Sequence, residues 1–251
     1  MAITPLPVIR SLPGGFRGLL DELFPWSCSL CGVESDGPFC EACRASIIDE
    51  SHRSCPRCAL PIGPFEEAAL PKGCRQCEGR RLGFDAALAL GPYDGPIREL
   101  CLRIKHQADA WLAARLGGLW AQSRGHRLPI GDDENLLVVP VPLHWWRHYS
   151  RGYDQAEALA SALGKALGVP SCGALKRVRK TPKLAGLSRT DRGRLMRGAF
   201  RVGWRGRRQV AGRTILLVDD ILTTGATCGA AARALKRAGA RRVIAAVIAR
   251  A

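Results

Sequence analysis

Residues 215–227 combine a short apolar run, two adjacent carboxylates and a threonine-rich turn. The four apolar residues 215–218 predict a buried strand, and Asp219 and Asp220 stand at its carboxyl end. The turn that follows offers backbone N–H groups and the positive end of the next helix, which suit a phosphate group. The two carboxylates can accept hydrogen bonds from two sugar hydroxyls. The segment therefore predicts one site that holds a phosphorylated ribose, with Asp219 and Asp220 as the catalytic pair.

The turn itself supplies the predicted ligand-binding residues. A strand end that runs into a helix start is where open α/β sheets bind their ligands. The alternative is an acidic turn that merely caps a helix, which would leave two carboxylates, three threonines and a glycine in this order unexplained. The predicted phosphate-binding residues are Thr223, Thr224, Gly225, Ala226 and Thr227.

Eight of the 11 cysteines form four C-x-x-C pairs. Two such pairs can bring four thiolates to one tetrahedral ion, as Zn²⁺ prefers, and leave no open position for catalysis. Pairing of neighbours predicts two structural zinc sites, although the spacing alone leaves crossed pairing open. A redox role is the alternative, but redox C-x-x-C motifs come singly. The predicted ligands are Cys28, Cys31, Cys40 and Cys43 in one site, and Cys55, Cys58, Cys74 and Cys77 in the other.

Length and cysteine usage set the expected class and compartment. The 251 residues are enough for one full core and a small appendage. Prolines and glycines interrupt the first 23 residues, and no apolar run approaches a membrane span, so we expect no secretory signal and no membrane insertion. We therefore expect a cytoplasmic protein, in which paired cysteines bind metal. The remaining Cys101, Cys172 and Cys228 are predicted to be ordinary small apolar residues.

The net charge of +16 is unevenly distributed along the chain. Residues 1–82 hold 9 basic and 10 acidic residues, whereas residues 83–251 hold 29 and 12. Within the second part, residues 176–213 hold 14 basic residues and one acid, Asp191. A solubilising surface is the alternative explanation, but so extreme a ratio favours a polyanionic ligand or a nucleic acid as partner.

From Gly83 onward, strands alternate with helices, which predicts an α/β fold with a doubly wound, mainly parallel sheet. We therefore expect a zinc-ribbon module at residues 19–82 and an α/β domain at residues 83–251. The expected strands are 84–90, 136–141, 215–218 and 243–249, and the expected helices are 96–106, 110–123, 155–167 and 226–238.

Two basic stretches are further candidates for phosphate contacts. After the strand at 136–141, a loop offers Arg147 and Arg151, whose forked donors suit a pyrophosphate; a solvated loop anchored by tryptophans is the alternative. Residues 180–188 predict a lid-like loop, and Ser188 predicts the N-cap of a short basic helix. This segment would suit a bound pyrophosphate or a nucleic-acid backbone. Lys105 is expected to complement a helix C-terminus rather than to reach a phosphate.

Residues 215–227 resemble the phosphoribosyl pyrophosphate (PRPP) signature of type I phosphoribosyltransferases. The resemblance implies that Asp219 and Asp220 hold the ribose 2′- and 3′-hydroxyls and that the Thr/Gly loop holds the 5′-phosphate. It also implies that the loop containing Arg147 and Arg151 contacts pyrophosphate, and that residues 180–188 form a flexible lid.

The whole pattern is similar to the ComF (ComFC-like) family. The shared order is four cysteine knuckles, Pro-Val-Pro-Leu-His with Arg-Gly-Tyr-Asp-Gln, the basic segment, Arg-Gly-Ala-Phe at 197–200, and the signature. The resemblance implies a role in natural competence and the handling of incoming single-stranded DNA, beside a helicase and a recombination mediator. Two functions remain open: a Mg²⁺-dependent phosphoribosyltransferase with an unknown acceptor, and a non-catalytic single-stranded DNA-binding factor on the same scaffold.

Overall fold

The computed structural model describes residues 27–48, 53–63, 73–106, 109–131, 135–143, 153–179 and 188–251. The chain divides into two compact units, Met1–Ile48 and Asp49–Ala251. Within the described ranges, no helix has the length and apolar character needed to cross a membrane.

The larger unit alternates strands and helices, as the sequence predicts. The described elements of both units, in chain order, are α2 (Glu41–Ile47) in the smaller unit and then, in the larger unit, β1 (Ala86–Pro92), α3 (Gly95–Arg103), α4 (Ala110–Arg124), the 3₁₀ turn η4 (Gly125–Arg127), β2 (Leu136–Pro140), α6 (Gln155–Leu167), β3 (Leu175–Arg177), α7 (Arg189–Met196), β4 (Phe200–Val202), α8 (Trp204–Val210), β5 (Thr214–Leu222), α9 (Ala226–Arg237) and β6 (Arg242–Arg250).

Four strands form a parallel sheet in the order β1-β6-β5-β2. An isolated parallel bridge between Val138 and Ser171 extends the pairing beyond β2. The strands β3 and β4 form a separate antiparallel pair. Because β5 and β6 lie in the middle of the sheet, most of their side chains are buried, which explains the apolar runs at residues 215–218 and 243–249. The predicted α/β fold with a mainly parallel sheet is confirmed.

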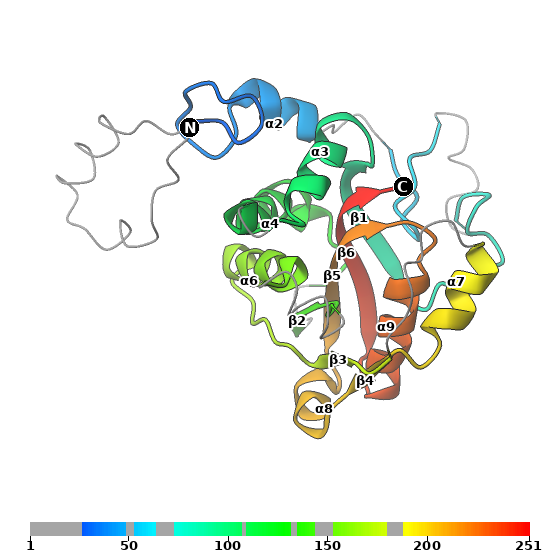
Figure 1. Ribbon diagram of the computed structural model, residues 1–251. Helices are drawn as coiled ribbons and strands as arrows, with labels where there is room; N and C mark the ends of the chain where they lie inside the picture. Colours follow the sequence, from blue (N-terminus) through cyan, green and yellow to red (C-terminus); the bar gives the residue numbers. More distant parts are fainter. Residues whose placement is uncertain are drawn as a thin grey trace. The chain divides into compact units, whose positions relative to one another are not determined.

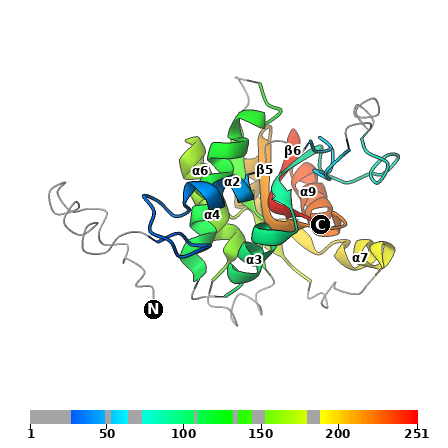
Figure 2. The ribbon, with the colours of Figure 1, turned by 90° about the horizontal axis from the view of Figure 1, so that it is seen from above.

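Helices cover both faces of this sheet. Figures 1 and 2 show α3, α4 and α6 on one face, and α9 with α7 on the other. Trp120 of α4 is 1% exposed, and its indole N–H donates to the carbonyl of Val247 in β6 at 3.1 Å. The helices α4 and α6 approach closely at Gly117, where a Cβ atom would lie 2.4 Å from the carbonyl oxygen of Leu159. Glycine at this position therefore sets the spacing of the two helices.

Local sequence signals fix several helix ends. Asp154 caps α6 by accepting hydrogen bonds from the N–H groups of Ala156 and Glu157, and Gly168 ends the helix in the left-handed conformation. Ser188 caps α7 by accepting from the N–H of Asp191, as predicted. These caps explain why the sequence predicted both ends of α6 and the start of α7.

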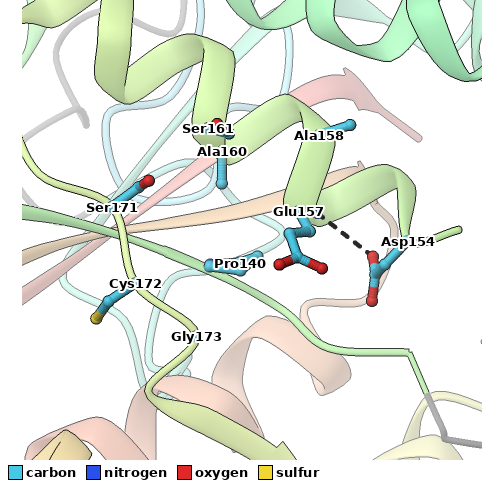
Figure 3. Close-up of a pocket in the computed structure, with 9 residues that line it drawn as sticks. All are labelled: Pro140, Asp154, Glu157, Ala158, Ala160, Ser161, Ser171, Cys172 and Gly173. Atoms are coloured by element: carbon cyan, nitrogen blue, oxygen red, sulfur yellow. Dashed lines mark hydrogen bonds between the residues drawn. The ribbon is translucent and has the colours of Figure 1, made fainter.

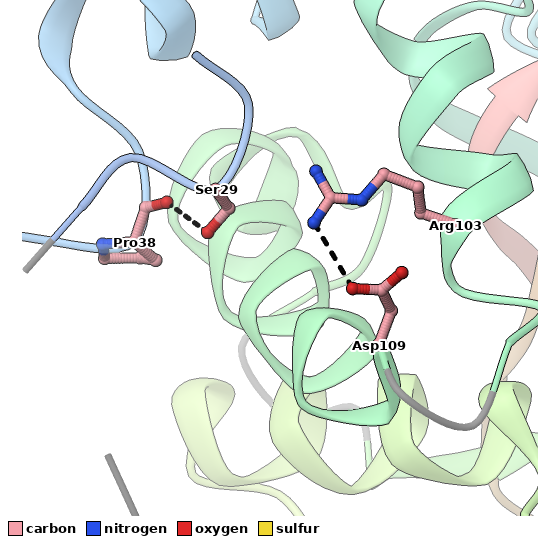
Figure 4. A network of polar contacts seen from close by, with 4 residues as sticks. All are labelled: Ser29, Pro38, Arg103 and Asp109. Carbon is pink, nitrogen blue, oxygen red and sulfur yellow. Dashed lines mark hydrogen bonds and ion pairs between the residues drawn. The ribbon is translucent and has the colours of Figure 1, made fainter. Parts of the chain in front are cut away.

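The smaller unit contains α2 and the knuckles around it. Its chain is held by short-range bonds, such as the hydroxyl of Ser29 donating to the carbonyl of Pro38 at 2.5 Å (Figure 4). In the larger unit, Arg103 at the end of α3 pairs with Asp109 before α4 at 3.3 Å (Figure 4). That ion pair joins consecutive helices on the same face of the sheet.

Four elements of the larger unit differ from the sequence expectation. The strand β5 runs to Leu222, so it includes both aspartates instead of ending before them. The short strands β3 and β4 and the helix α8 were not predicted. Each of these three spans only three to seven residues, which is too short for a clear periodic signal.

Candidate functional site

The second group of four cysteines forms a compact buried cluster in the larger unit. The sulfur atoms of Cys55 and Cys77 lie 3.6 Å apart, as do those of Cys58 and Cys74. Cys74 and Cys77 are separated by 3.8 Å. Four sulfurs around one Zn²⁺ at about 2.3 Å would lie about 3.8 Å from one another, so the cluster fits a tetrahedral zinc ion. A hydrogen bond from the Cys58 thiol lowers the pKa of Cys55 to about 4, and the same contact raises the pKa of Cys58, so a neighbouring thiol stabilises one thiolate of the cluster.

The first group forms a similar cluster in the smaller unit. The four sulfur atoms of this group lie within 4.8 Å of one another, and those of Cys31 and Cys40 are 3.7 Å apart. Neighbouring pairs therefore combine into two separate four-cysteine sites, and crossed pairing does not occur. The members of the first site are Cys28, Cys31, Cys40 and Cys43.

The backbone of the first knuckle has the same conformation and hydrogen bonds in both clusters. The N–H groups of Cys28 and Cys55 each donate to the carbonyl five residues later, at 2.7 and 2.8 Å. The residue after the first knuckle of each cluster adopts a positive φ, which is 76° at Gly32 and 56° at Ala59. This residue also donates back to the first cysteine's carbonyl in both cases. The repeat indicates two zinc ribbons built on the same turn.

The strand β5, the turn after it and the helix α9 build the phosphate-site candidate. Gly225 has a φ of 77° and is the N-cap residue of α9, where it has no side chain to cap the helix. The first N–H groups of α9 and the helix dipole favour an anion at this end. The hydroxyl of Thr224 accepts from the N–H of Ala226 at 3.4 Å, which orders the turn. The predicted residues 223–227 thus form one continuous turn at the carboxyl end of β5.

The two aspartates contact different layers of the fold. A carboxylate oxygen of Asp219 lies 3.6 Å from the sulfur of Cys228 in α9. A carboxylate oxygen of Asp220 lies 3.9 Å from the ammonium nitrogen of Lys105, just after α3. Each carboxylate also accepts the N–H of the next residue, at 2.9 and 2.8 Å. Since α3 and α9 cover opposite faces, the alternation of side chains along β5 separates the two contacts (Figure 1).

Burial perturbs the ionisation of Asp219 and its neighbour. Burial, and then the nearby Asp220 carboxylate, raise the pKa of Asp219 well above its ordinary value. Burial, and then Asp219, likewise raise the pKa of the Cys228 thiol. The thiol therefore stays protonated at neutral pH and can donate to Asp219. Cys228 was expected to be an ordinary apolar residue, and no local pattern in the chain indicates this contact.

Lys105 has a role that the sequence did not suggest. It was expected to complement the C-terminus of α3, yet its ammonium group faces Asp220. The pair is partly exposed, with side-chain exposures of 28% for Lys105 and 15% for Asp220. The cation therefore lies beside the carboxylate predicted to hold the ribose.

Two arginines join the second cysteine cluster to the phosphate-site turn. Arg250 of β6 is 7% exposed and donates to the carbonyls of Cys58, at 2.8 Å, and Leu222, at 2.9 Å. Arg80, three residues after the last cysteine of the cluster, donates to the carbonyl of Thr224 at 3.2 Å. The turn and the second ribbon are thus parts of one hydrogen-bonded assembly. The predicted boundary after residue 82 stays a prediction, but the second ribbon packs in the same compact unit as the sheet.

Glycine permits this close packing. A Cβ atom at Gly229 of α9 would lie 2.1 Å from the carbonyl oxygen of Leu82, and one at Gly83 would lie 2.5 Å from the carbonyl oxygen of Gly229. The chain leaving the second ribbon therefore touches the backbone of α9 directly. No larger residue fits at either position without moving one of the two segments.

Several predicted site residues lie outside the described residues. These are Arg147 and Arg151, together with the lid-like segment 180–187, so their predicted roles stay predictions. The basic helix that follows is present as α7, and its Met196 is wholly buried.

A hollow of about 410 Å³ lies beside the end of β2, and the aspartates of β5 are not among its lining residues. Asp154 and Glu157 at the start of α6 face the segment 171–173 across it (Figure 3). It contains none of the residues of the phosphate-site turn. Its lining residues are Pro140, Asp154, Glu157, Ala158, Ala160, Ser161, Ser171, Cys172 and Gly173.

Comparison with known families gives the same two parts. Residues 19–78 match the double zinc ribbon domain, and residues 150–251 match the phosphoribosyl transferase domain. The DNA utilization protein YhgH of Salmonella typhi is 30% identical over 224 residues, which cover 87% of this chain and 92% of the relative. The chain belongs to the ComF family. Other members include competence protein F of Haemophilus influenzae, at 28% identity over 81% of this chain and 93% of the relative. Competence protein ComFC of Bacillus subtilis is 28% identical over 82% of this chain and 81% of the relative.

A solved structure of glutamine PRPP amidotransferase from Bacillus subtilis, complexed with ADP and GMP, is similar over 54% of this chain and 25% of its own chain. The TM-score is 0.35 and the sequence identity 20%, so this likeness carries no functional argument. The family membership and the geometry of the site are the basis for function.

Proposed function

We propose that this ComF-family chain binds PRPP or a related phosphoribosyl ligand at the carboxyl end of β5. The observation that carries the proposal is the geometry of residues 219–227. Two carboxylates at a strand end are followed by a Gly225 turn and a helix start that has no side-chain cap. Such a turn presents N–H donors to a phosphate, while the carboxylates accept hydroxyl hydrogen bonds.

Each part of the proposed site has a defined role. Asp219 and Asp220 accept hydrogen bonds from the ribose hydroxyls, and residues 223–227 hold the 5′-phosphate. Mg²⁺ prefers oxygen atoms as ligands, and carboxylates supply them. Asp219 and Asp220 therefore fit a phosphoribosyl ligand that carries this ion. Mg²⁺ held beside these carboxylates would neutralise negative charge on the pyrophosphate. Arg147 and Arg151 are proposed to contact the pyrophosphate.

The corresponding activity is transfer of the phosphoribosyl group to an acceptor with release of pyrophosphate. Two groups of this chain would act through position and charge. The carboxylates at the end of β5 would orient the ribose, and the helix dipole of α9 would hold the phosphate. The acceptor is not identified by any feature of the described residues.

We further propose that the chain acts in DNA uptake and processing in the cytoplasm. The names of its relatives, which refer to competence and DNA utilization, support this role. A competence helicase and a recombination mediator are the partners that the family resemblance suggests. The two four-cysteine sites are proposed to hold structural Zn²⁺, since their geometry leaves no open coordination position.

Calorimetry of the zinc-loaded protein with PRPP and Mg²⁺ tests this proposal. The double variant Asp219→Ala/Asp220→Ala is expected to abolish binding. The control Glu34→Ala/Glu41→Ala removes two exposed carboxylates from the smaller unit and is expected to bind normally. Equal binding by both double variants would refute the proposed site. Loss of binding in the aspartate variant alone would justify a screen of nucleobase and amine acceptors.

A second candidate function, single-stranded DNA binding, is favoured by the distribution of charge. Residues 83–251 carry a net charge of +17, while residues 1–82 carry −1. Binding that depends on phosphate contacts should weaken steeply as salt rises. A salt-independent affinity would count against this function.

A further inference from the structure

The helix α8 presents a tryptophan to solvent. Trp204, the first residue of α8, is 65% exposed, although tryptophan side chains are usually well buried. The guanidinium groups of Arg205 and Arg208 lie over its ring, at 5.1 and 5.7 Å from the ring centre. An aromatic ring flanked by two arginines offers both stacking surface and positive charge.

The side of α8 opposite to Trp204 packs against the rest of the protein. Gly206 and Val210 lie on this side of α8 and are buried. A Cβ atom at Gly206 would lie 3.0 Å from the carbonyl oxygen of Ala174, so the helix packs directly on the backbone before β3. The exposed ring is therefore held on a fixed scaffold.

The neighbouring β3–β4 pair places two cations side by side. Lys176 of β3 lies directly opposite Arg201 of β4 in the antiparallel register. Both residues are exposed. Like charges opposite each other destabilise a strand pair, so the folding of β3 and β4 gives no reason for this arrangement. An anionic partner would turn the repulsion into a favourable contact.

Within the described part of the chain, no carboxylate neutralises these cations. The sequence contains no Asp or Glu in residues 171–179 or in residues 192–213. Among the residues that the structure describes, neither Lys176, Arg201, Arg205 nor Arg208 forms an ion pair. The charge of this region is therefore available to a ligand.

We propose that Lys176, Arg201, Trp204, Arg205 and Arg208, here called the Trp204 surface, bind single-stranded DNA. The cations would contact phosphates, and the tryptophan ring would stack on an unpaired base. Paired bases in a duplex do not expose their faces for such stacking, which selects the single strand. The choice of DNA rests on the proposed role in DNA processing, but the surface is separate from the PRPP-binding residues.

An anionic membrane surface is the competing partner for a basic, tryptophan-bearing helix. Membrane-binding helices bury a continuous apolar face in the lipid interface. The exposed side of α8 carries one aromatic residue among arginines and a glutamine, and its apolar side is buried in the protein. The composition therefore favours nucleic acid.

Fluorescence anisotropy with a labelled 20-nucleotide oligo(dT) tests the Trp204 surface. Trp204→Ala is expected to weaken binding at least about fivefold, since one stacked base contributes about 1–3 kcal/mol. Arg205→Ala/Arg208→Ala is expected to lower the slope of log affinity against log salt by about 1.4, for two phosphate contacts. The controls are Leu102→Ala and Arg98→Ala, which remove an exposed apolar and an exposed basic side chain from α3.

The competing ligands and the PRPP site are tested with the same proteins. A duplex of equal length, oligo(U), and vesicles with anionic lipid are each expected to bind more weakly than oligo(dT). Trp204→Ala is expected to keep full PRPP affinity, while Asp219→Ala/Asp220→Ala keeps its DNA affinity. If the native protein does not bind PRPP but Trp204→Ala still weakens the binding of oligo(dT), the proposal for the Trp204 surface stands and only the proposed PRPP site is refuted. Loss of less than about twofold in Trp204→Ala, or tighter binding of duplex, RNA or vesicles, would overturn the proposal.

Discussion

The buried Arg250 should stabilise the second zinc ribbon and the phosphate-site turn together. Its guanidinium donates to the carbonyl of Cys58 in the ribbon and to that of Leu222 just before the turn. The substitution Arg250→Met keeps most of the length of the side chain and removes both hydrogen bonds. The carbonyl of Leu222 keeps its bond from the N–H of Ala251.

The expected loss follows from the two hydrogen bonds. Each has a charged donor, and bonds of this kind contribute about 1.5–3 kcal/mol. We take the lower figure because Leu222 keeps another donor, which gives a loss of about 3 kcal/mol. For a unit of about 200 residues this lowers the thermal midpoint by about 6–12 °C. Because Cys58 is a zinc ligand in the proposed site, zinc affinity at this ribbon should fall about tenfold.

Calorimetric melting in zinc-saturated buffer, and competition with a colorimetric chelator, measure the two effects. The matched control is Arg241→Met, which replaces an exposed arginine just before β6. Its midpoint and zinc affinity are expected to match those of the native protein. If Arg250→Met melts within about 2 °C of this control, the link between ribbon and turn is not structural.

Two further predictions concern the metal sites and the buried aspartate. Zinc analysis of the native protein should give two ions per chain. Each of the single variants Cys43→Ser and Cys58→Ser should retain one ion per chain. Only Cys58→Ser should lower the thermal midpoint of the sheet unit, because its cluster is part of that core; equal shifts would contradict this. Since its folded pKa is raised, Asp219 disfavours folding increasingly as pH rises above the ordinary aspartate range. Asp219→Asn should therefore raise the midpoint at pH 7.5 but not at pH 4 and should weaken PRPP binding; an unchanged midpoint at pH 7.5 would refute the burial argument.

Local sequence signals were sufficient for the main elements. The apolar runs of β2, β5 and β6 predicted their strands because central parallel strands are buried on both faces. Asp154 and Gly168 marked the ends of α6 because capping depends on a few adjacent residues. The cysteine spacing identified the eight candidate zinc ligands for the same reason, since each knuckle is one tight turn.

Contacts between distant segments could not be read in this way. The sequence left the pairing of the cysteine knuckles open, and only the packed chain shows that neighbours combine. Likewise, Arg250 meets Cys58 across 192 positions, and Lys105 meets Asp220 across the layers of the fold. No periodicity or motif records such a contact.

The sequence by itself therefore determined the chemistry available to this protein: two sets of four cysteines, an acidic pair before a threonine-rich turn, and a basic C-terminal part. Tertiary structure decided which of these groups meet. It joined the second ribbon to the turn through Arg80 and Arg250, placed Cys228 against Asp219, and exposed Trp204 between arginines. The physical reason is that caps, knuckles and strands are stabilised by neighbours in sequence, whereas buried hydrogen bonds and exposed surfaces are fixed only when the layers pack.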